Sequence, residues 1–355
     1  MVALYLSVRD FSLGGSLHPT TLGLQYLSIA VLVIGVLVLH SDRFPLTNMI
    51  LCLLIGSALS YIWFPTSASS SNIVKFGLGP QIAAVVLFVV ARGSRQGLYL
   101  LSCAVLSMIF TAFAFRSMSG IVLVAGALTT WKLGRAHSKP KPVRTRGQQG
   151  LGIAIALVAT VAVVAWAYPA LARGGLLGKA QAERVEGRGH SAIDLLLSSR
   201  PETIIAFEVI KTSPVLGLGA SPADHIGKSV LNDAISRVHD LAPSVSTGLV
   251  RDRLTGEINV HSLLFYGWIT AGLLGLAFWL IVAACSISSI IRPLRFPATD
   301  ALATFIGLWT LWDVFFSPWS VHISTSIAAA VLLAFSGGSR RESEIDEDSV
   351  LSSQS

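Results

Sequence analysis

The sequence predicts an all-α polytopic membrane protein with about nine transmembrane helices, or ten if a further helix precedes the first. A large, partly helical extracytoplasmic loop is expected between the sixth and seventh spans. The chain of 355 residues is 53% hydrophobic and 13% charged, whereas about 25% of an ordinary globular chain is charged. Apolar runs near the ~20 residues that a helix needs to cross a bilayer recur along the chain. These observations exclude a soluble enzyme.

The nine spans follow from cutting the apolar runs where charges or clusters of Pro, Ser and Gly interrupt them. They are residues 22–39, 46–64, 73–91, 98–115, 120–131, 151–168, 262–291, 298–316 and 321–336. Six spans form an N-terminal transmembrane bundle at 1–168, and three form a C-terminal group at 261–336. The fifth span is short by itself, and the seventh is longer than a straight crossing needs, so it is expected to protrude on the outer side.

Basic residues gather on alternate loops between the spans, as the positive-inside rule requires. The loops assigned to the cytoplasm carry Arg43, Arg92, Arg95, six basic residues within the loop 132–149, Arg292, Arg295, Arg340 and Arg341. The N-terminus is therefore expected outside and the C-terminus inside, with a polar tail at 337–355 that is expected to be disordered. Because the net charge of +7 reflects these short loops, it does not indicate a nucleic-acid partner.

The extracytoplasmic segment 169–260 is far longer than an ordinary connection, and such loops are generally functional or disordered. Apolar residues spaced as on an amphipathic helix occur at 192–212, with a restart near Pro201, and again at 229–241. Residues 250–258 alternate like a small hairpin. The segment is therefore expected to form a compact cap on the outer membrane face.

Four features project to the outer face in this topology. They are Arg116 at the tip between the fourth and fifth spans, Arg200 in the cap, His261 just before the seventh span, and Asp313 near three tryptophans at the outer end of the eighth. Each has a structural alternative, because interfacial arginine and histidine side chains and an aromatic belt need no function. A carboxylate near the hydrocarbon is more suggestive, since it is costly and is usually paired or functional.

Outward-facing arginines and one histidine together favour a particular chemistry. The planar guanidinium binds phosphate through two parallel hydrogen bonds, so converging arginines suit a diphosphate at the membrane surface. A histidine can take the proton from a hydroxyl nucleophile. The sequence has no cysteine and histidine cluster with zinc spacing and no Gly-x-Ser-x-Gly turn. These residues favour metal-independent glycosyl transfer from a polyprenyl-diphosphate sugar to an acceptor hydroxyl, without a cofactor.

Two motifs in order carry a family resemblance. The first runs from Ser199-Arg200 through Phe207 to Pro214-Val-Leu-Gly217-Leu-Gly219, and the second is His261-Ser-Leu-Leu-Phe-Tyr266-Gly267 followed by Gly272 and Gly275. With the upstream turn Phe115-Arg116-Ser117-Met-Ser119-Gly120, they resemble the O-antigen ligase and O-antigen polymerase family of membrane glycosyltransferases. The match covers residues 199–275 and the turn at Arg116.

The resemblance implies a cell-envelope enzyme of polysaccharide biosynthesis in the cytoplasmic (inner) membrane of a bacterium. It would act on an undecaprenyl-diphosphate-linked glycan at the outer face. Arg116 and Arg200 would bind the donor diphosphate, and Arg200 and His261 would be the catalytic residues. Weaker candidates for the same pocket are Arg251, Arg253, Asp313, Gly217 and Gly219.

The chain departs from the family pattern at three points, and rival functions stay open. Ser262 replaces the usual Asn, Tyr266 replaces an acidic residue, and nine spans are fewer than usual. The implied partners are the lipid-linked donor, a glycan or lipid acceptor and membrane lipid, while polymerase and ligase are not distinguished. A transporter or flippase for an anionic lipid-linked substrate is the alternative, supported by Lys75, Gly77, Gly79 and Pro80 in the third span. A third possible function is that of a non-catalytic membrane scaffold.

Overall fold

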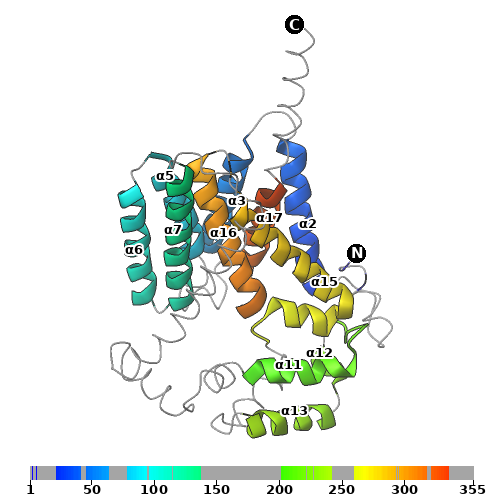
Figure 1. The fold of residues 1–355 in the computed structure, drawn as a ribbon. Helices are drawn as coiled ribbons and strands as arrows, with labels where there is room; N and C mark the ends of the chain where they lie inside the picture. The colour runs from blue at the N-terminus through cyan, green and yellow to red at the C-terminus, as the bar shows by residue number, and fades with distance from the viewer. Residues whose placement is uncertain are drawn as a thin grey trace, which may run out of the picture. The chain divides into compact units, whose positions relative to one another are not determined.

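In the computed structural model of the chain, every regular element among the described residues is a helix (Figure 1). The structure describes residues 2, 5, 21–40, 45–63, 78–93, 96–113, 115–136, 201–220, 222–226, 228–241, 260–292, 294, 296–317 and 321–335. The all-α prediction is therefore confirmed for this part of the chain. The predicted sixth span at 151–168 and the predicted hairpin at 250–258 lie outside the described residues.

The chain divides into two compact units, each assembled from separate stretches of sequence. The first unit comprises Met1–Leu27, Pro142–Ile281 and Asp313–Trp319, and the second comprises Ser28–Lys141, Val282–Trp312 and Ser320–Ser355. Three helices contribute residues to both units: α2 (Thr21–His40), α15 (Leu263–Ile291) and α16 (Pro297–Phe316). The described part of the predicted cap therefore shares one unit with the end of the helix at 297–316, although the two are far apart in sequence.

The second unit is built from long apolar helices. They are α2 (Thr21–His40), α3 (Leu46–Trp63), α5 (Gly79–Gly93), α6 (Gln96–Ala112), α7 (Arg116–Ala136), α16 (Pro297–Phe316) and α17 (Val321–Phe335). Within this unit α5 packs against α3 and α6, α6 against α7, and α17 against α3. Most of these helices lie within a few residues of a predicted span, because the charges and turn residues that interrupt an apolar run also interrupt the helix.

Helix α7 begins earlier and ends later than the predicted fifth span at 120–131. The sequence placed Arg116 in a turn, but the structure makes it the first residue of α7, and the amide of Ser119 donates to the Phe115 carbonyl at 3.1 Å. The difference arises because a charge marks the end of apolar character and not the end of backbone hydrogen bonding. The expected fifth span at 120–131 therefore lies inside a longer helix of 21 residues.

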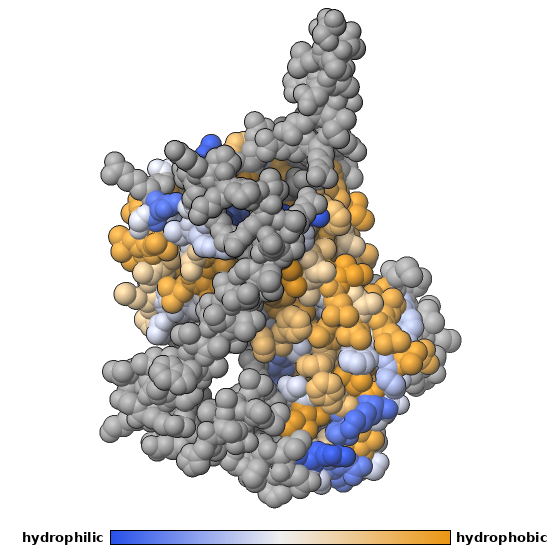
Figure 2. All heavy atoms as spheres, in the orientation of Figure 1, coloured by the Kyte–Doolittle hydropathy of each residue, from blue (hydrophilic) through white to orange (hydrophobic). Residues whose placement is uncertain are grey.

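Helix α6 is apolar on both its buried and its exposed face. Its large buried side chains are Tyr99, Cys103, Leu106 and Phe110. Its opposite face exposes Leu98, Leu101, Val105 and Met108, at helical spacing and with Met108 71% exposed. Figure 2 shows hydrophobic spheres gathered over this helix. A surface helix of a soluble protein would carry polar residues on that face.

Small and hydroxyl-bearing residues join α6 to α7. The hydroxyls of Ser107 and Ser119 lie 2.6 Å apart, and that of Thr111 lies 3.0 Å from Ser119. A Cβ at Gly126 would lie 2.8 Å from the Cys103 sulfur. Close approach at small residues, with hydroxyl hydrogen bonds between helices, is typical of helix packing in membranes.

By length and composition, one helix among the described residues qualifies as a membrane span, namely α15 (Leu263–Ile291). Five shorter apolar helical segments accompany it, at Tyr26–Leu37, Leu46–Ser60, Gly79–Gly93, Gln96–Ala112 and Ile323–Phe335. The arrangement of nine spans stays a prediction.

A buried ion pair joins the end of α7 to the start of α16. Lys132 Nζ lies 3.2 Å from Asp300 Oδ1 and donates to the Thr304 hydroxyl at 2.8 Å. The two charged side chains are only 12% and 7% exposed, and Asp300 also accepts from the Leu294 amide. Removing one partner of such a pair leaves the other charge buried without compensation.

Replacing Lys132 with methionine is expected to lower the free energy of unfolding by about 3–5 kcal/mol, because Asp300 loses its countercharge. Thermal unfolding of the purified full-length protein in detergent measures the effect. Lys211→Met is the matched control, since Lys211 pairs with Glu208 at an exposed position and such pairs contribute about 1 kcal/mol or less. Equal unfolding temperatures for the two variants would contradict the structural role of the buried pair.

The first unit contains the helices of the predicted cap. They are α11 (Pro201–Thr212), α12 (Pro222–His225) and α13 (Lys228–Leu241), together with the first part of α15. The structure thus places helices where the sequence predicts them at 201–212 and 229–241, while 192–200 lies outside the described part.

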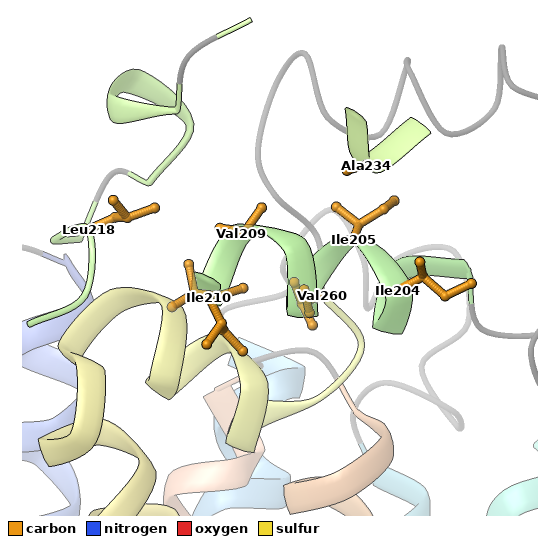
Figure 3. Packing of buried hydrophobic residues seen from close by; sticks show 9 residues of the cluster. Ile204, Ile205, Val209, Ile210, Leu218, Ala234 and Val260 are labelled. Atoms are coloured by element: carbon orange, nitrogen blue, oxygen red, sulfur yellow. The ribbon is translucent and has the colours of Figure 1, made fainter. Parts of the chain in front are cut away.

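A hydrophobic cluster holds α11 between α13 and α15 (Figure 3). Its members are Ile204, Ile205, Ala206, Val209 and Ile210 of α11, Ala234 of α13, Ile269 of α15, and Leu218 and Val260 outside these helices. Fully burying an aliphatic side chain stabilises a fold by about 1.5–3 kcal/mol. The cluster therefore fixes α11 against the start of α15, where the candidate site lies.

Candidate functional site

Helix α15 is broken at Gly272. This residue has φ 59° and ψ −141°, a backbone conformation that is essentially restricted to glycine. The two halves of the helix run in different directions (Figure 1). The break therefore interrupts the ladder of backbone hydrogen bonds in the most apolar of the described helices.

The turn Pro214–Gly219 supplies hydrogen bonds that replace those lost at the break. The amides of Leu218 and Gly219 donate to the carbonyls of Ile269 and Thr270, at 2.8 and 3.0 Å. The amide of Leu273 donates to the Val215 carbonyl at 3.0 Å. Backbone groups in an apolar environment need such partners. The turn and the broken helix therefore stabilise each other.

Glycine is required where the turn meets the helix. Gly217 and Gly219 have φ of 71° and 85°, and a Cβ at Gly217 would collide with the Thr270 carbonyl. A Cβ at Gly272 would collide with the Val215 carbonyl. The Gly217-Leu-Gly219 motif is thus explained by backbone packing against α15.

Two aromatic side chains also hold the turn. Trp268 Nε1 donates to the Pro214 carbonyl at 2.8 Å, and the Tyr5 hydroxyl donates to the Leu216 carbonyl. Because Trp268 lies in the first half of α15, its bond ties that half to the chain that follows α11. His261 lies two residues before the start of this half-helix.

Ser262 forms the N-cap of α15. Its hydroxyl accepts from the Phe265 amide at 3.4 Å and donates to the Val314 carbonyl at 3.2 Å. Serine is among the preferred N-cap residues, so its hydroxyl stabilises the start of α15. His261 therefore sits between the buried residue Val260 and a capped helix.

Glu202 faces His261 from the first turn of α11. Its Oε1 atom lies 3.4 Å from His261 Nδ1. Glu202 is 8% exposed, whereas the side chain of His261 is 31% exposed. The rings of Phe207 and Phe265, whose centroids lie 5.0 Å apart, also join α11 to α15. The arrangement pairs a partly accessible imidazole with a buried carboxylate.

Asp313 lies in the last turn of α16 and is only 4% exposed. Its Oδ1 atom accepts from the Ser317 hydroxyl at 2.7 Å. The next residue, Val314, is the one whose carbonyl accepts from Ser262. Asp313 is therefore held one residue from the contact between the end of α16 and the start of α15.

The structure thus brings His261, Glu202 and the end of α16 together in the first unit, with Gly217 and Gly219 packed against the same broken helix. Arg200, Arg251 and Arg253 lie outside the described residues. Arg116 begins α7 in the second unit, and its side chain also lies outside the described part. No group of three or more potential metal ligands occurs where the chain is described.

Sequence reasoning missed Glu202. The residue lies within the first family-like motif, two positions after Arg200. An acidic residue in the first turn of a helix is explained by the helix dipole alone, so its type and position gave no reason to select it. Only the packing of α11 on α15 places it beside His261.

The chain was compared with protein-family models, curated proteins and solved structures. None matches it. The resemblance to the O-antigen ligase and polymerase family therefore rests on the residues of the two motifs and the Arg116 turn.

Proposed function

We propose that this chain is an integral membrane glycosyltransferase that polymerises or ligates a polyprenyl-diphosphate-linked oligosaccharide at the outer face of the cytoplasmic membrane. The observation that carries the proposal is His261, which is partly accessible, held at a capped helix start and paired with buried Glu202. A histidine fixed in this way has the features of a general base. The family-like motifs around it supply the substrate class.

The apolar surfaces support the membrane part of the proposal. On α6 an exposed apolar face lies opposite a buried apolar face, and on α2 the exposed residues Val31, Ile34 and Leu37 recur at helical spacing. Lipid is the solvent in which such faces are stable. Helix α15 is 29 residues long, so its length accommodates a break as well as a crossing. The nine-span topology belongs to this proposal.

In the proposed reaction the acceptor hydroxyl oxygen attacks the anomeric carbon of the donor sugar. A new glycosidic bond forms, the bond from that carbon to the diphosphate oxygen breaks, and the polyprenyl diphosphate leaves. His261 takes the acceptor proton. Because Nδ1 faces Glu202, Nε2 is the nitrogen assigned to this proton transfer. No metal or cofactor is part of the proposed reaction.

Arg200 and Arg116 are proposed to bind the donor diphosphate and to stabilise the charge that grows on it as it leaves. Arg200 directly precedes α11 in the sequence, two positions before Glu202. Arg251, Arg253 and Asp313 remain weaker candidates for the same pocket. The buried carboxylate of Asp313, near Ser262, is the best supported of these three.

The broken helix α15 favours one rival, a transporter for an anionic lipid-linked substrate. Transporters use interrupted helices whose freed backbone groups bind the substrate. Here, however, Ile269, Thr270 and Leu273 already bond to the turn Pro214–Gly219. The break is therefore occupied by the protein itself, which favours the transferase.

A glycan analysis in a deletion strain of the source organism tests the proposal in cells. The strain is complemented with wild type, Arg200→Ala or His261→Ala at matched membrane expression. We expect deletion and both variants to abolish long polymer, or to leave polymer on its lipid carrier. The first pattern identifies a polymerase and the second a ligase. Wild-type glycan in both complemented variants would refute the proposal.

A further inference from the structure

We propose that Glu202 is a positioning residue that acts through His261 by fixing its tautomer and stabilising its protonated form. This inference rests on the proposed function, because it assigns the partner of the proposed general base. It goes beyond the family-like motifs, which give no role to the acidic residue of this helix turn.

The contact has the geometry that this role needs. Glu202 Oε1 and His261 Nδ1 are 3.4 Å apart, so the carboxylate lies on the Nδ1 side of the ring and favours the tautomer that carries its proton on Nδ1. That arrangement leaves the lone pair on Nε2, the nitrogen that receives the acceptor proton. The hydrogen bond on one ring nitrogen decides which tautomer the other presents. A similar carboxylate orients the imidazole in Ser-His-Asp enzymes.

Packing holds the carboxylate in place. Glu202 lies in the first turn of α11 and is 8% exposed. The next turns of α11 contribute five buried residues to the cluster that includes Val260 and Ile269. Val260 directly precedes His261. The backbone on both sides of the contact is therefore buried, which limits the movement of Glu202 away from the imidazole.

The described elements around His261 carry few charged residues. The first half of α15, residues 263–271, carries no Asp, Glu, Lys or Arg, and Asp313 at the end of α16 is held beside Ser317. The second acidic residue of α11, Glu208, pairs with Lys211 at 2.7 Å and Arg237 at 3.7 Å. Glu202 contacts the imidazole, whereas Glu208 pairs elsewhere and is a matched control on the same helix.

The test uses purified full-length protein in liposomes and lipid-linked oligosaccharide extracted from the deletion strain. Transfer rates are measured against pH for wild type, Glu202→Gln, Glu202→Asp and Glu208→Gln. Glutamine keeps a carbonyl that accepts from Nδ1 but removes the negative charge. We expect Glu202→Gln to lower the maximal rate by about 10- to 100-fold, a part of the 10²–10⁴ that a general base contributes.

The pH profile separates this role from a merely structural one. A negative charge beside the imidazole favours its protonated form, so its loss is expected to move the acid limb of the profile to lower pH. Glu202→Asp keeps the charge and is expected to keep the acid limb near the wild-type position, even if the rate falls. Glu208→Gln is expected to match wild type in rate and profile.

A double variant completes the test. In the His261→Ala background, Glu202→Gln is expected to change the residual rate by less than about twofold, because its partner is already missing. The inference is overturned if Glu202→Gln keeps the wild-type rate and profile, or if it lowers the rate equally with and without His261. Wild-type transfer by His261→Ala alone would instead refute the proposed function. If Glu202→Gln does not fold, Glu202→Ala takes its place: the acid limb is expected to move to lower pH, and an unmoved limb overturns the inference.

Discussion

Replacing His261 with alanine is expected to lower the rate of glycan transfer by about 10²–10⁴, the contribution of a positioned general base. The protein should still fold and insert, because His261 precedes the capped start of α15 and contributes no part of the hydrophobic cluster. Transfer is measured with purified protein in liposomes, and thermal unfolding is measured on the same samples.

His225→Ala is the matched control for this experiment. His225 is an exposed histidine at the end of α12, in the same unit. Its replacement is expected to leave the transfer rate unchanged. An equal loss in both variants would show that the effect is not specific to the Glu202–His261 contact. An unchanged rate in His261→Ala would show that His261 takes no part in the reaction.

Replacing Gly272 with alanine is expected to destabilise the protein by about 3 kcal/mol or more, because two costs combine. The backbone conformation at Gly272 is strained for any residue with a side chain, at about 1–3 kcal/mol. The new Cβ would also collide with the Val215 carbonyl and displace the turn that bonds to Ile269 and Thr270. The unfolding temperature in detergent measures the loss.

Gly35→Ala gives the comparison for Gly272→Ala. Gly35 lies inside α2, and a Cβ there meets no atom within 4 Å. Alanine is favoured over glycine in a helix by about 1 kcal/mol, so this variant is expected to match or exceed wild-type stability. If Gly272→Ala were as stable as Gly35→Ala, the contact between the turn and the broken helix would carry no stabilising role.

Hydrophobic runs and interrupting charges located most of the described helices. The ends of α3 and α17, for example, lie within a residue or two of the predicted spans at 46–64 and 321–336. These features are local, so the sequence shows them directly. The full extent of α7 was not predictable in this way, because Arg116 and Lys132 end the apolar run while the backbone remains helical.

The break in α15 could not be predicted from hydrophobicity. Apolar residues continue on both sides of Gly272, and a single glycine in an apolar run is compatible with an unbroken helix. The excess length of the seventh span suggested a helix that protrudes, but the structure bends it at Gly272 and inserts a turn from about fifty residues upstream. The break in α15 depends on hydrogen bonds between segments that are distant in the sequence.

The candidate site was predicted only in part. The motif order drew attention to His261, Gly217 and Gly219, and the structure places all three at or against the first half of α15. Glu202 was not selected, since its contact with His261 depends on how α11 packs on α15. Residues that meet through tertiary packing leave no periodic signal in a single sequence.

The central claim is that this chain transfers a glycan from a polyprenyl diphosphate carrier by means of His261. The most direct measurement incubates liposomes containing the purified full-length protein with labelled lipid-linked oligosaccharide from the deletion strain, and follows label in longer or ligated glycan. We predict product with wild type and His225→Ala, and a loss of at least about 100-fold with His261→Ala. Absence of product with folded wild-type protein and both acceptor types, or equal product with His261→Ala, would contradict the account.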